Sequence, residues 1–317
     1  MIKTERLTKR FGHFTAVENL TLNIRAGEIY GFLGPNGAGK TTTILMLLGI
    51  LKPTMGSISL FGQDFYPDRL DLKKRIGVVP ERHPTGMWKW MTAHEYLSLF
   101  ADLYLVSNFE NRSRRLLEMV ELHEVENKKI IEFSRGMLQK LSIVRALLHD
   151  PDILFLDEPI SGLDPMGIKR VRELICSENR EGRTIFISSH LLSEIEKICH
   201  RVAIISSGRL LAEEKMDSLL STLMMDKEIH IELEEIPREL PGQIKKMDFV
   251  IDCFTDGKSI VVKVPKKGDY RKRVVKFFMD RHLIPLKVEE RSASLEEAFT
   301  ILTQENVKMF SAKEEQA

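Results

Sequence analysis

The chain of 317 residues is long enough for about two domains with packed cores, at the usual size of roughly 100–200 residues per domain. Its 47 Lys and Arg residues nearly balance its 46 Asp and Glu residues, and the net charge of +1 argues against a protein whose main role is to coat DNA. The three cysteines are widely spaced and form no CxxC pair. A disulfide framework or a zinc knuckle is therefore not expected, and a reducing compartment suits the composition.

Two features argue against a secretory signal or a membrane span. Charged residues stand at Lys3 and Glu5, where a signal peptide needs an apolar segment. The longest apolar stretch, Ile44–Leu51, is far shorter than a bilayer crossing requires. We therefore expect that a membrane role depends on a separate partner that spans the bilayer.

From Met1 to about Leu220, short β-rich runs alternate with helical patterns, which is typical of a mostly parallel α/β sheet. The segment Met91–Tyr104 repeats apolar residues at helical spacing, and Thr92 with Glu95 forms a capping-box pattern that predicts a helix. Buried strands are predicted at four apolar runs: Glu28–Leu33, Ile153–Leu156, Thr184–Ser188 and Val202–Ile205.

After the charged, Met-rich stretch Glu213–Lys227 the pattern changes, and a separate α+β accessory domain of about a hundred residues is predicted over 221–317. Helices are predicted at about Tyr270–His282 and from Leu295, where Ser294 and Glu297 form a second capping box. Strands are predicted at short alternating runs: Glu228–Leu233, Phe249–Cys253, Ser259–Val264 and Leu286–Val288.

The segment Gly34–Thr41, GPNGAGKT, fits the phosphate-loop pattern G-x-x-x-x-G-K-[ST] and lies between an apolar strand and a helix. Glycines let successive backbone N–H groups turn toward phosphate oxygens, and the helix N-terminus adds a favourable dipole. We expect Lys40 to reach the β- and γ-phosphates and the Thr41 hydroxyl to bind Mg²⁺.

The run Ile153–Glu158 is an apolar strand that ends in two acids. In a phosphate-loop fold this strand is expected to lie beside the one that leads into the loop. Asp157 can then hold Mg²⁺ through water, and Glu158 can polarise an attacking water molecule.

Three further motifs follow in order: Phe133–Gln139 (FSRGMLQ), Ser161–Asp164 (SGLD) and Ile187–His190 (ISSH). Together with the phosphate loop and the acidic strand they resemble the nucleotide-binding domain of ATP-binding cassette (ABC) transporters, over about Met1 to Leu220. The variants in these motifs look like those of export-type cassettes with a separate permease.

The resemblance implies a phosphate-loop NTPase cassette over residues 1–220, with a mixed, largely parallel sheet and a helical subdomain at about 82–145. It gives Glu158 the role of catalytic base and His190 that of the sensor of the γ-phosphate, with Lys40 as the third catalytic residue. It assigns Mg²⁺ to Thr41, Glu81 and Asp157, and the dimer interface to Ser134 and Asp164. The ATP contacts that it implies are Phe11, Gly34, Pro35, Asn36, Gly37, Ala38, Gly39, Lys40, Thr41, Thr42, Ser134 and Gly136.

Phe11 matches the aromatic residue that stacks on adenine, although the family usually has Tyr there, and the alternative is an ordinary core phenylalanine. The usual signature is Leu-Ser-Gly-Gly-Gln, but here Arg135 replaces the first Gly and Met137 the Gln. Arg135 either adds positive charge near the site or lies solvated on the surface. Glu81 stands where the family commonly has Gln, and it brings a full negative charge to the site.

Both tryptophans, Trp88 and Trp90, follow Glu81 in a region that receives a helix of the membrane subunit in the family. Aromatic residues with methionine suit an interface anchor, and the alternative is that one or both pack internally.

The sequence thus predicts an ATPase subunit that binds ATP and Mg²⁺, forms a homodimer and drives an integral membrane permease, most simply an exporter. It would be cytoplasmic and peripheral on the inner face of the cell membrane, with no nucleic-acid partner. The alternative is an ABC-type ATPase that acts on DNA or the ribosome, and a phosphate-loop kinase is a third option. The cargo is not readable from these residues, and the accessory domain either steadies the dimer or regulates it.

Overall fold

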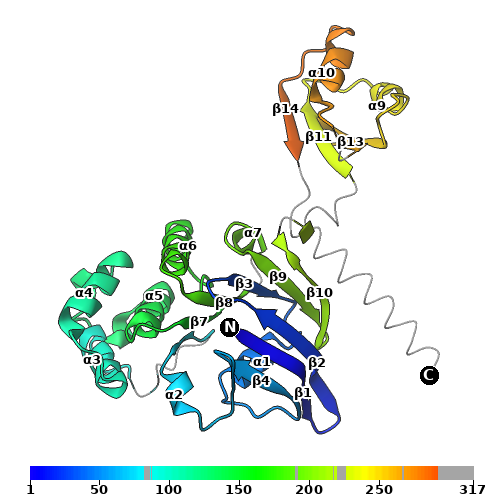
Figure 1. The fold of residues 1–317 in the computed structure, drawn as a ribbon. Helices are drawn as coiled ribbons and strands as arrows, with labels where there is room; N and C mark the ends of the chain where they lie inside the picture. The colour runs from blue at the N-terminus through cyan, green and yellow to red at the C-terminus, as the bar shows by residue number, and fades with distance from the viewer. Residues whose placement is uncertain are drawn as a thin grey trace. The chain divides into compact units, whose positions relative to one another are not determined.

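The computed structural model describes residues 1–81, 86, 88–189, 192–216, 218–219, 226–265 and 268–291. The chain divides into two compact units, of which the first is Met1–Met216 and the second contains the remaining residues (Figure 1). The division lies a few residues before the boundary expected at Leu220. Within the described part of the chain, no helix is both long enough and apolar enough to cross a membrane.

The first unit begins with an antiparallel sheet in the order β2-β1-β4-β5. A tight turn at Gly12 and His13 connects β1 to β2, and Phe11 pairs with Phe14 across it. The turn therefore places two aromatic side chains at the tip of the hairpin. The strands are β1 (Ile2–Phe11), β2 (Phe14–Ile24), β4 (Met55–Leu60) and β5 (Gln63–Asp64).

The central sheet of the first unit has six strands in the order β10-β9-β3-β8-β7-β6. All neighbouring strands run parallel except β9 and β10. This confirms the predicted mixed, largely parallel sheet. The strands are β3 (Ile29–Leu33), β6 (Ile76–Val79), β7 (Ile153–Asp157), β8 (Thr184–Ser189), β9 (Arg201–Ser206) and β10 (Arg209–Lys215).

One expectation about this sheet is wrong. The acidic strand β7 does not lie beside β3, which leads into the phosphate loop, because β8 lies between them and pairs with both. Strand order in a parallel sheet is set by the crossover connections and not by local sequence, so the motif spacing did not reveal the inserted strand. As a consequence, Ser188 on β8 stands in register with Asp157 on β7.

The central strands read as continuous apolar runs because both faces of a parallel sheet are covered. Every residue of β3 and β7 is buried. The ring of Phe186 on β8 lies 5.3 Å from that of Phe32 and 5.5 Å from that of Phe155, centroid to centroid. This aromatic layer fixes the middle of the sheet, whose carboxyl ends carry the candidate site.

The helices α3, α4 and α5 pack on one another and span much of the predicted helical subdomain (Figure 1). The Thr92–Glu95 capping box is formed with both of its hydrogen bonds, which confirms the predicted start of α3. The helices of the first unit are α1 (Lys40–Leu47), α2 (Leu70–Lys73), α3 (Ala93–Tyr104), α4 (Phe109–Met119), α5 (Arg135–Leu147), α6 (Pro165–Arg180) and α7 (Leu192–Ile195), with 3-10 turns at His123–Val125 and Ile130–Glu132.

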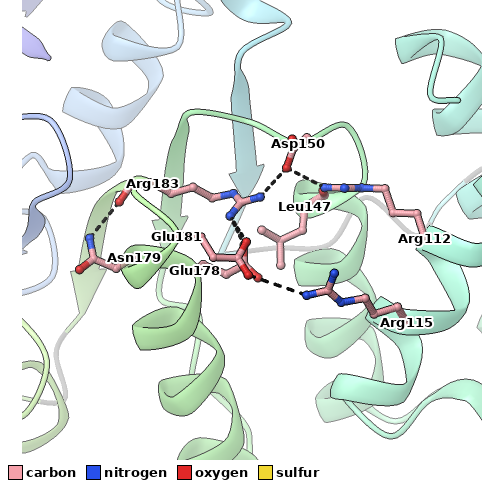
Figure 2. A network of polar contacts seen from close by, with 8 residues as sticks. All are labelled: Arg112, Arg115, Leu147, Asp150, Glu178, Asn179, Glu181 and Arg183. Atoms are coloured by element: carbon pink, nitrogen blue, oxygen red, sulfur yellow. Dashed lines mark hydrogen bonds and ion pairs between the residues drawn. The ribbon is translucent and has the colours of Figure 1, made fainter. Parts of the chain in front are cut away.

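A polar network ties α4 to the central sheet and the end of α6 (Figure 2). Arg183, just before β8, donates to Asp150 and lies 2.9 Å from the Glu178 carboxylate. Arg112 on α4 reaches the same Asp150 at 3.0 Å, and Arg115 lies 3.8 Å from Glu181. The network thus joins a helix of the predicted helical subdomain to the end of α6 and to the segments that lead into β7 and β8.

The described residues of the second unit form a four-stranded antiparallel sheet in the order β12-β13-β11-β14 and two helices. The sequence of elements, β-α-β-β-α-β, with the first strand between the third and the fourth, is the split βαβ arrangement of ferredoxin-like domains. Its core is separate and includes Ile231, Val262 and Phe278. The elements are β11 (Asp226–Glu232), α9 (Leu240–Ile244), β12 (Asp252–Asp256), β13 (Ser259–Pro265), α10 (Arg271–Met279) and β14 (Lys287–Arg291).

The strand predicted at Phe249–Cys253 is shifted toward the C-terminus, to β12. Phe249 lies before the strand, where its buried ring stacks on Tyr270 at 4.9 Å. The edge strand β12 is mostly polar, so its alternation was hidden by the more apolar run before it. The helix predicted from Leu295, with its capping pair Ser294 and Glu297, lies outside the described residues.

Candidate functional site

The phosphate loop connects β3 to α1, and Gly39 stands at the N-terminal cap of that helix. Gly39 has φ of +105°, and a Cβ atom there would lie 2.6 Å from the carbonyl oxygen of Ala16. An L side chain would suffer both a strained backbone and a clash. The turn therefore requires glycine at this position.

Within the described chain, no side chain caps the N-terminus of α1, and its first turn contains no acid. The first N–H groups of the helix can thus face an anion. The buried Lys40 ammonium donates to the carbonyl oxygens of Gly34 at 2.7 Å and Pro35 at 3.3 Å. These bonds hold the lysine along the loop, where a phosphate would bind.

Asp157 ends β7 with 5 % of its surface exposed. Thr41 Oγ1 lies 3.4 Å from Asp157 Oδ2, and the Ser188 hydroxyl donates to Asp157 Oδ1. Burial raises the pKa of the Asp157 carboxyl, the charge of Glu81 raises this pKa further, and the hydrogen bonds from Ser188 and Thr41 act in the opposite direction. The carboxylate is thus held firmly and faces the first turn of α1.

Glu158 follows in the left-handed backbone region, with φ of +52°. For a residue with a Cβ this conformation costs about 1–2 kcal/mol, and surrounding contacts must hold it. Its backbone N–H donates both to the Ser188 carbonyl oxygen at 3.1 Å and to Ser188 Oγ at 3.2 Å. The turn separates the two adjacent acids at the end of β7.

A cleft of about 680 Å³ joins these parts. Nine predicted site residues line it: Asn36, Gly37, Gly39, Lys40, Thr41, Thr42, Glu81, Asp157 and Glu158. The phosphate loop, both acids and Glu81 therefore share one space, large enough for a small-molecule ligand.

Three lining residues were not predicted, namely Phe14, Ala16 and Ser161. Phe14 is 64 % exposed and faces the cleft from the hairpin tip, whereas Phe11, its cross-strand partner, is half exposed and is not among the lining residues. The exposure of Phe11 rules out the alternative of an ordinary core residue. The sequence signal for Phe14 is the pair of aromatic residues, Phe11 and Phe14, that flanks a two-residue turn.

The side chains in the cleft suit Mg²⁺. The Thr41 hydroxyl and the carboxylates of Asp157 and Glu81 offer the oxygen ligands that this ion prefers, and nucleotide phosphates supply further oxygens. No group of three His, Cys, Asp or Glu side chains that could hold a metal by themselves occurs in the described part of the chain. A magnesium ion here would thus depend on the nucleotide for part of its coordination.

Two other predicted motifs cap helices. Ser134 accepts a hydrogen bond from Met137 N–H at 3.2 Å at the start of α5, and Asp164 accepts one from Gly167 N–H at 2.7 Å at the start of α6. Both residues are exposed, and Gly136 lies in the first turn of α5. The Arg135 guanidinium donates to Ser161 Oγ at 3.1 Å, so it reaches from the signature loop to a residue that lines the cleft.

The two tryptophans differ in their surroundings. Trp88 is half-buried and makes edge contacts with Tyr96 and Phe100 of α3, at centroid distances of 6.2 and 6.1 Å. Trp90 is 62 % exposed. His190 lies outside the described residues.

Comparison with known proteins supplies the family. The family model described as ABC transporter matches residues 17–161. The bacitracin transport ATP-binding protein BcrA of Bacillus licheniformis is 39 % identical over 303 residues, which cover 95 % of this chain and 97 % of that protein. The linearmycin resistance ATP-binding protein LnrL of Bacillus subtilis (strain 168) is 30 % identical over 309 residues, 96 % of this chain and 98 % of that protein.

Among solved structures, a bacterial ABC transporter cassette described as dimeric has a TM-score of 0.63 and 28 % identity, covering 68 % of this chain and 99 % of that one. The phosphate loop, the acidic strand and the long similarity to BcrA agree with one another. The chain therefore belongs to the ABC transporter family, as an ATP-binding subunit with ATPase activity.

Proposed function

We propose that two copies of this chain close around two ATP molecules and that hydrolysis drives a separate membrane permease in the export direction. The observation that carries the proposal is the single cleft in which Lys40 and Thr41 face Asp157 and Glu158. The phosphate-binding groups and the acids thus line one cleft, and Thr41 Oγ1 lies 3.4 Å from Asp157 Oδ2, an arrangement that suits attack of water on a terminal phosphate.

The chain's own residues have distinct parts in this reaction. The loop N–H groups and Lys40 bind the β- and γ-phosphates and stabilise the charge that develops on them. Glu158 orients the attacking water and accepts its proton. The role proposed for His190, that of γ-phosphate sensor, rests on the family resemblance alone. Thr41, Asp157 and Glu81 would hold Mg²⁺, which supplies charge neutralisation between the phosphates when bound.

The dimer is proposed because Ser134, Gly136 and Asp164 are not among the residues that line the phosphate loop's cleft in their own chain. The exposure of Ser134 and Asp164 at helix starts suits contact with a second copy, where the N-terminus of α5 would face the γ-phosphate bound by that copy. The similarity to a cassette described as dimeric supports this arrangement.

The proposed permease contact centres on Trp90, because its ring is exposed, while Trp88 packs on α3 and supports the segment from inside. Exposed Trp side chains are enriched at protein interfaces. Through this contact the subunit would lie on the inner face of the cell membrane.

The cargo class is proposed from the relatives that match along nearly their whole length. They are named for bacitracin transport and for linearmycin resistance, and both similarities extend through the second unit. We infer that the permease partner exports an antibiotic-type molecule. The alternative of an ATPase that acts on DNA or the ribosome is not favoured, because these relatives are named as transport or resistance proteins.

The test uses a tagged Glu158→Gln chain in its native host, with Glu173→Gln on the exposed face of α6 as the matched control. We expect Glu158→Gln to bind ATP but to hydrolyse it about 100-fold more slowly or worse, since it lacks the base. The variant should accumulate as a dimer with ATP on size-exclusion chromatography, and mass spectrometry should find a polytopic membrane protein in equal amount. Wild-type turnover would refute the role of Glu158, and recovery of ribosomal proteins or DNA instead would favour the alternative.

A further inference from the structure

One buried hydroxyl contacts both acids of the site. Ser188, fully buried on β8, donates its hydroxyl to Asp157 Oδ1, and its Oγ accepts the Glu158 N–H at 3.2 Å. This double contact exists because Asp157 and Ser188 are register partners on neighbouring parallel strands. The Ser188 side chain thus connects Asp157, which is proposed to hold Mg²⁺, with Glu158, which is proposed to be the catalytic base.

The two contacts act on separate features. The hydrogen bond from Ser188 to Asp157 Oδ1 fixes the rotation of the carboxylate. The other oxygen, Oδ2, then faces Thr41 Oγ1, 3.4 Å away. The bond from the Glu158 N–H supports a residue whose φ of +52° carries a steric cost. Without the hydroxyl, the only acceptor that Ser188 would still offer to the Glu158 N–H is its carbonyl oxygen.

We propose that Ser188 is a positioning residue of the ATPase site, which orients Asp157 and holds the backbone turn of Glu158. The inference rests on the roles proposed for these two acids. Partners that orient metal-associated carboxylates commonly change metal affinity or activity by about 10- to 100-fold when they are removed. The phosphate loop contacts the nucleotide without Ser188, so the effect falls on turnover and on Mg²⁺ dependence.

The chain offers a matched control on the same strand. Thr184, at the other end of β8, is also fully buried, and its hydroxyl also accepts a backbone N–H, that of Gly27 at 3.0 Å. Its register partner is Ile153, at the start of β7 and away from the acids. Thr184→Val therefore removes a comparable hydrogen bond without touching the site.

The experiment compares Ser188→Ala, the nearly isosteric Ser188→Cys, and Thr184→Val in the full chain. ATP hydrolysis is measured against ATP and Mg²⁺ concentration, ATP binding is measured in EDTA, and thermal unfolding is followed by circular dichroism. Both Ser188 variants should lower kcat by about 10-fold or more and raise the half-saturating Mg²⁺ concentration severalfold. Their ATP affinity in EDTA should stay within about twofold of wild type, because the loop and Lys40 are intact.

The proposal is overturned if both Ser188 variants keep wild-type kcat and Mg²⁺ dependence, or if Thr184→Val lowers kcat equally at an equal loss of Tm. It is also overturned if only Ser188→Ala is impaired, since packing volume would then be the cause, or if both Ser188 variants fail to fold while Thr184→Val folds. Glu158→Gln is assayed in parallel. An active Glu158→Gln refutes the role proposed for Glu158, on which this inference rests, whereas an inactive one beside active Ser188 variants refutes this inference alone.

Discussion

Gly39 and Gly37 separate two reasons for glycine in the phosphate loop. Both have positive φ, +105° and +80°, but a Cβ on Gly37 would meet no atom within 4 Å, while one on Gly39 would lie 2.6 Å from the Ala16 carbonyl oxygen. A residue with a Cβ atom would therefore have a strained backbone at either position, but it would clash with a neighbouring atom only at position 39.

We expect Gly37→Ala to lower the free energy of unfolding by about 1–2 kcal/mol, which is the cost of a left-handed backbone for a residue with a Cβ. Gly39→Ala should lower it by more, since Ala16 on β2 or the loop must also move. Urea unfolding followed by circular dichroism gives both values. Equal losses in the two variants would show that the contact with Ala16 relaxes freely.

At the scale of single residues, candidate site residues that the sequence predicts from a local motif lie together in the structure, and their roles stay proposals. Lys40, Thr41, Asp157 and Glu158 stand at the ends of strands or at a helix start, and all four line the cleft. Ser188 could not be assigned its contacts because they depend on the order of strands in the sheet. The motif Ser161–Asp164 is visible in the sequence, but the position of Ser161 in the cleft depends on the geometry of a loop, which the spacing of motifs along the chain does not determine.

Among the structural elements, α4 is tied to the core by the arginine and carboxylate network of Figure 2. Glu178 is buried, and burial raises the pKa of its carboxyl, while the nearby Arg183 opposes this shift. Arg183 has 12 % of its side chain exposed and also contacts Asp150 and Glu181. Removing this arginine would leave the buried Glu178 without its 2.9 Å partner.

We expect Arg183→Met to destabilise the first unit by about 3 kcal/mol near pH 7, since breaking a buried pair leaves an uncompensated charge. The loss should be smaller at pH 5 than at pH 7. A carboxyl whose pKa is raised in the folded state binds its proton more tightly there, so its penalty grows as pH rises above the ordinary value of 4.5 and fades as pH falls. Urea unfolding at pH 5 and pH 7 measures both values, with Arg183→Met/Glu178→Gln as the control. A loss independent of pH, or one that Glu178→Gln does not relieve, would contradict this account.

Element types were predictable where the apolar pattern was strong. The buried strands β3, β7, β8 and β9 and the capped helix α3 were all expected, because each carries a continuous apolar run or a cap signal. The position of β12 was not, because an edge strand needs few apolar residues. The insertion of β8 between β3 and β7 was also missed, since pairing partners lie far apart in sequence.

For the whole molecule, the main feature is that the described residues of each unit bury a core of their own. The first unit buries a cluster that includes Phe32, Phe155 and Phe186, and the second buries its own cluster around Ile231 and Phe278. The two clusters share no residue. A unit with its own core can in principle fold by itself, and the smaller unit buries a smaller fraction of its surface.

Each unit contains one buried cysteine, whose accessibility can serve as a measure of the folding of that unit. Cys199 is buried in the first unit and Cys253 in the second, whereas Cys176 is only half-buried. Burial raises the pKa of the Cys199 thiol far above its usual range and that of Cys253 to about 11. Because the thiolate is the reactive form, both thiols should be protected as long as their own unit is folded.

We expect a Cys176→Ser chain to react with Ellman's reagent in two separate steps as urea rises, Cys253 first and Cys199 at higher urea. The reason is that the second unit has the smaller core, so it should open at a lower denaturant concentration. Mass spectrometry of labelled peptides identifies the thiol modified at each step, and Cys176→Ser/Cys253→Ser should lose only the first step. Simultaneous labelling of both thiols would show that the two units unfold in one cooperative transition. The stability of the second unit would then depend on the first unit.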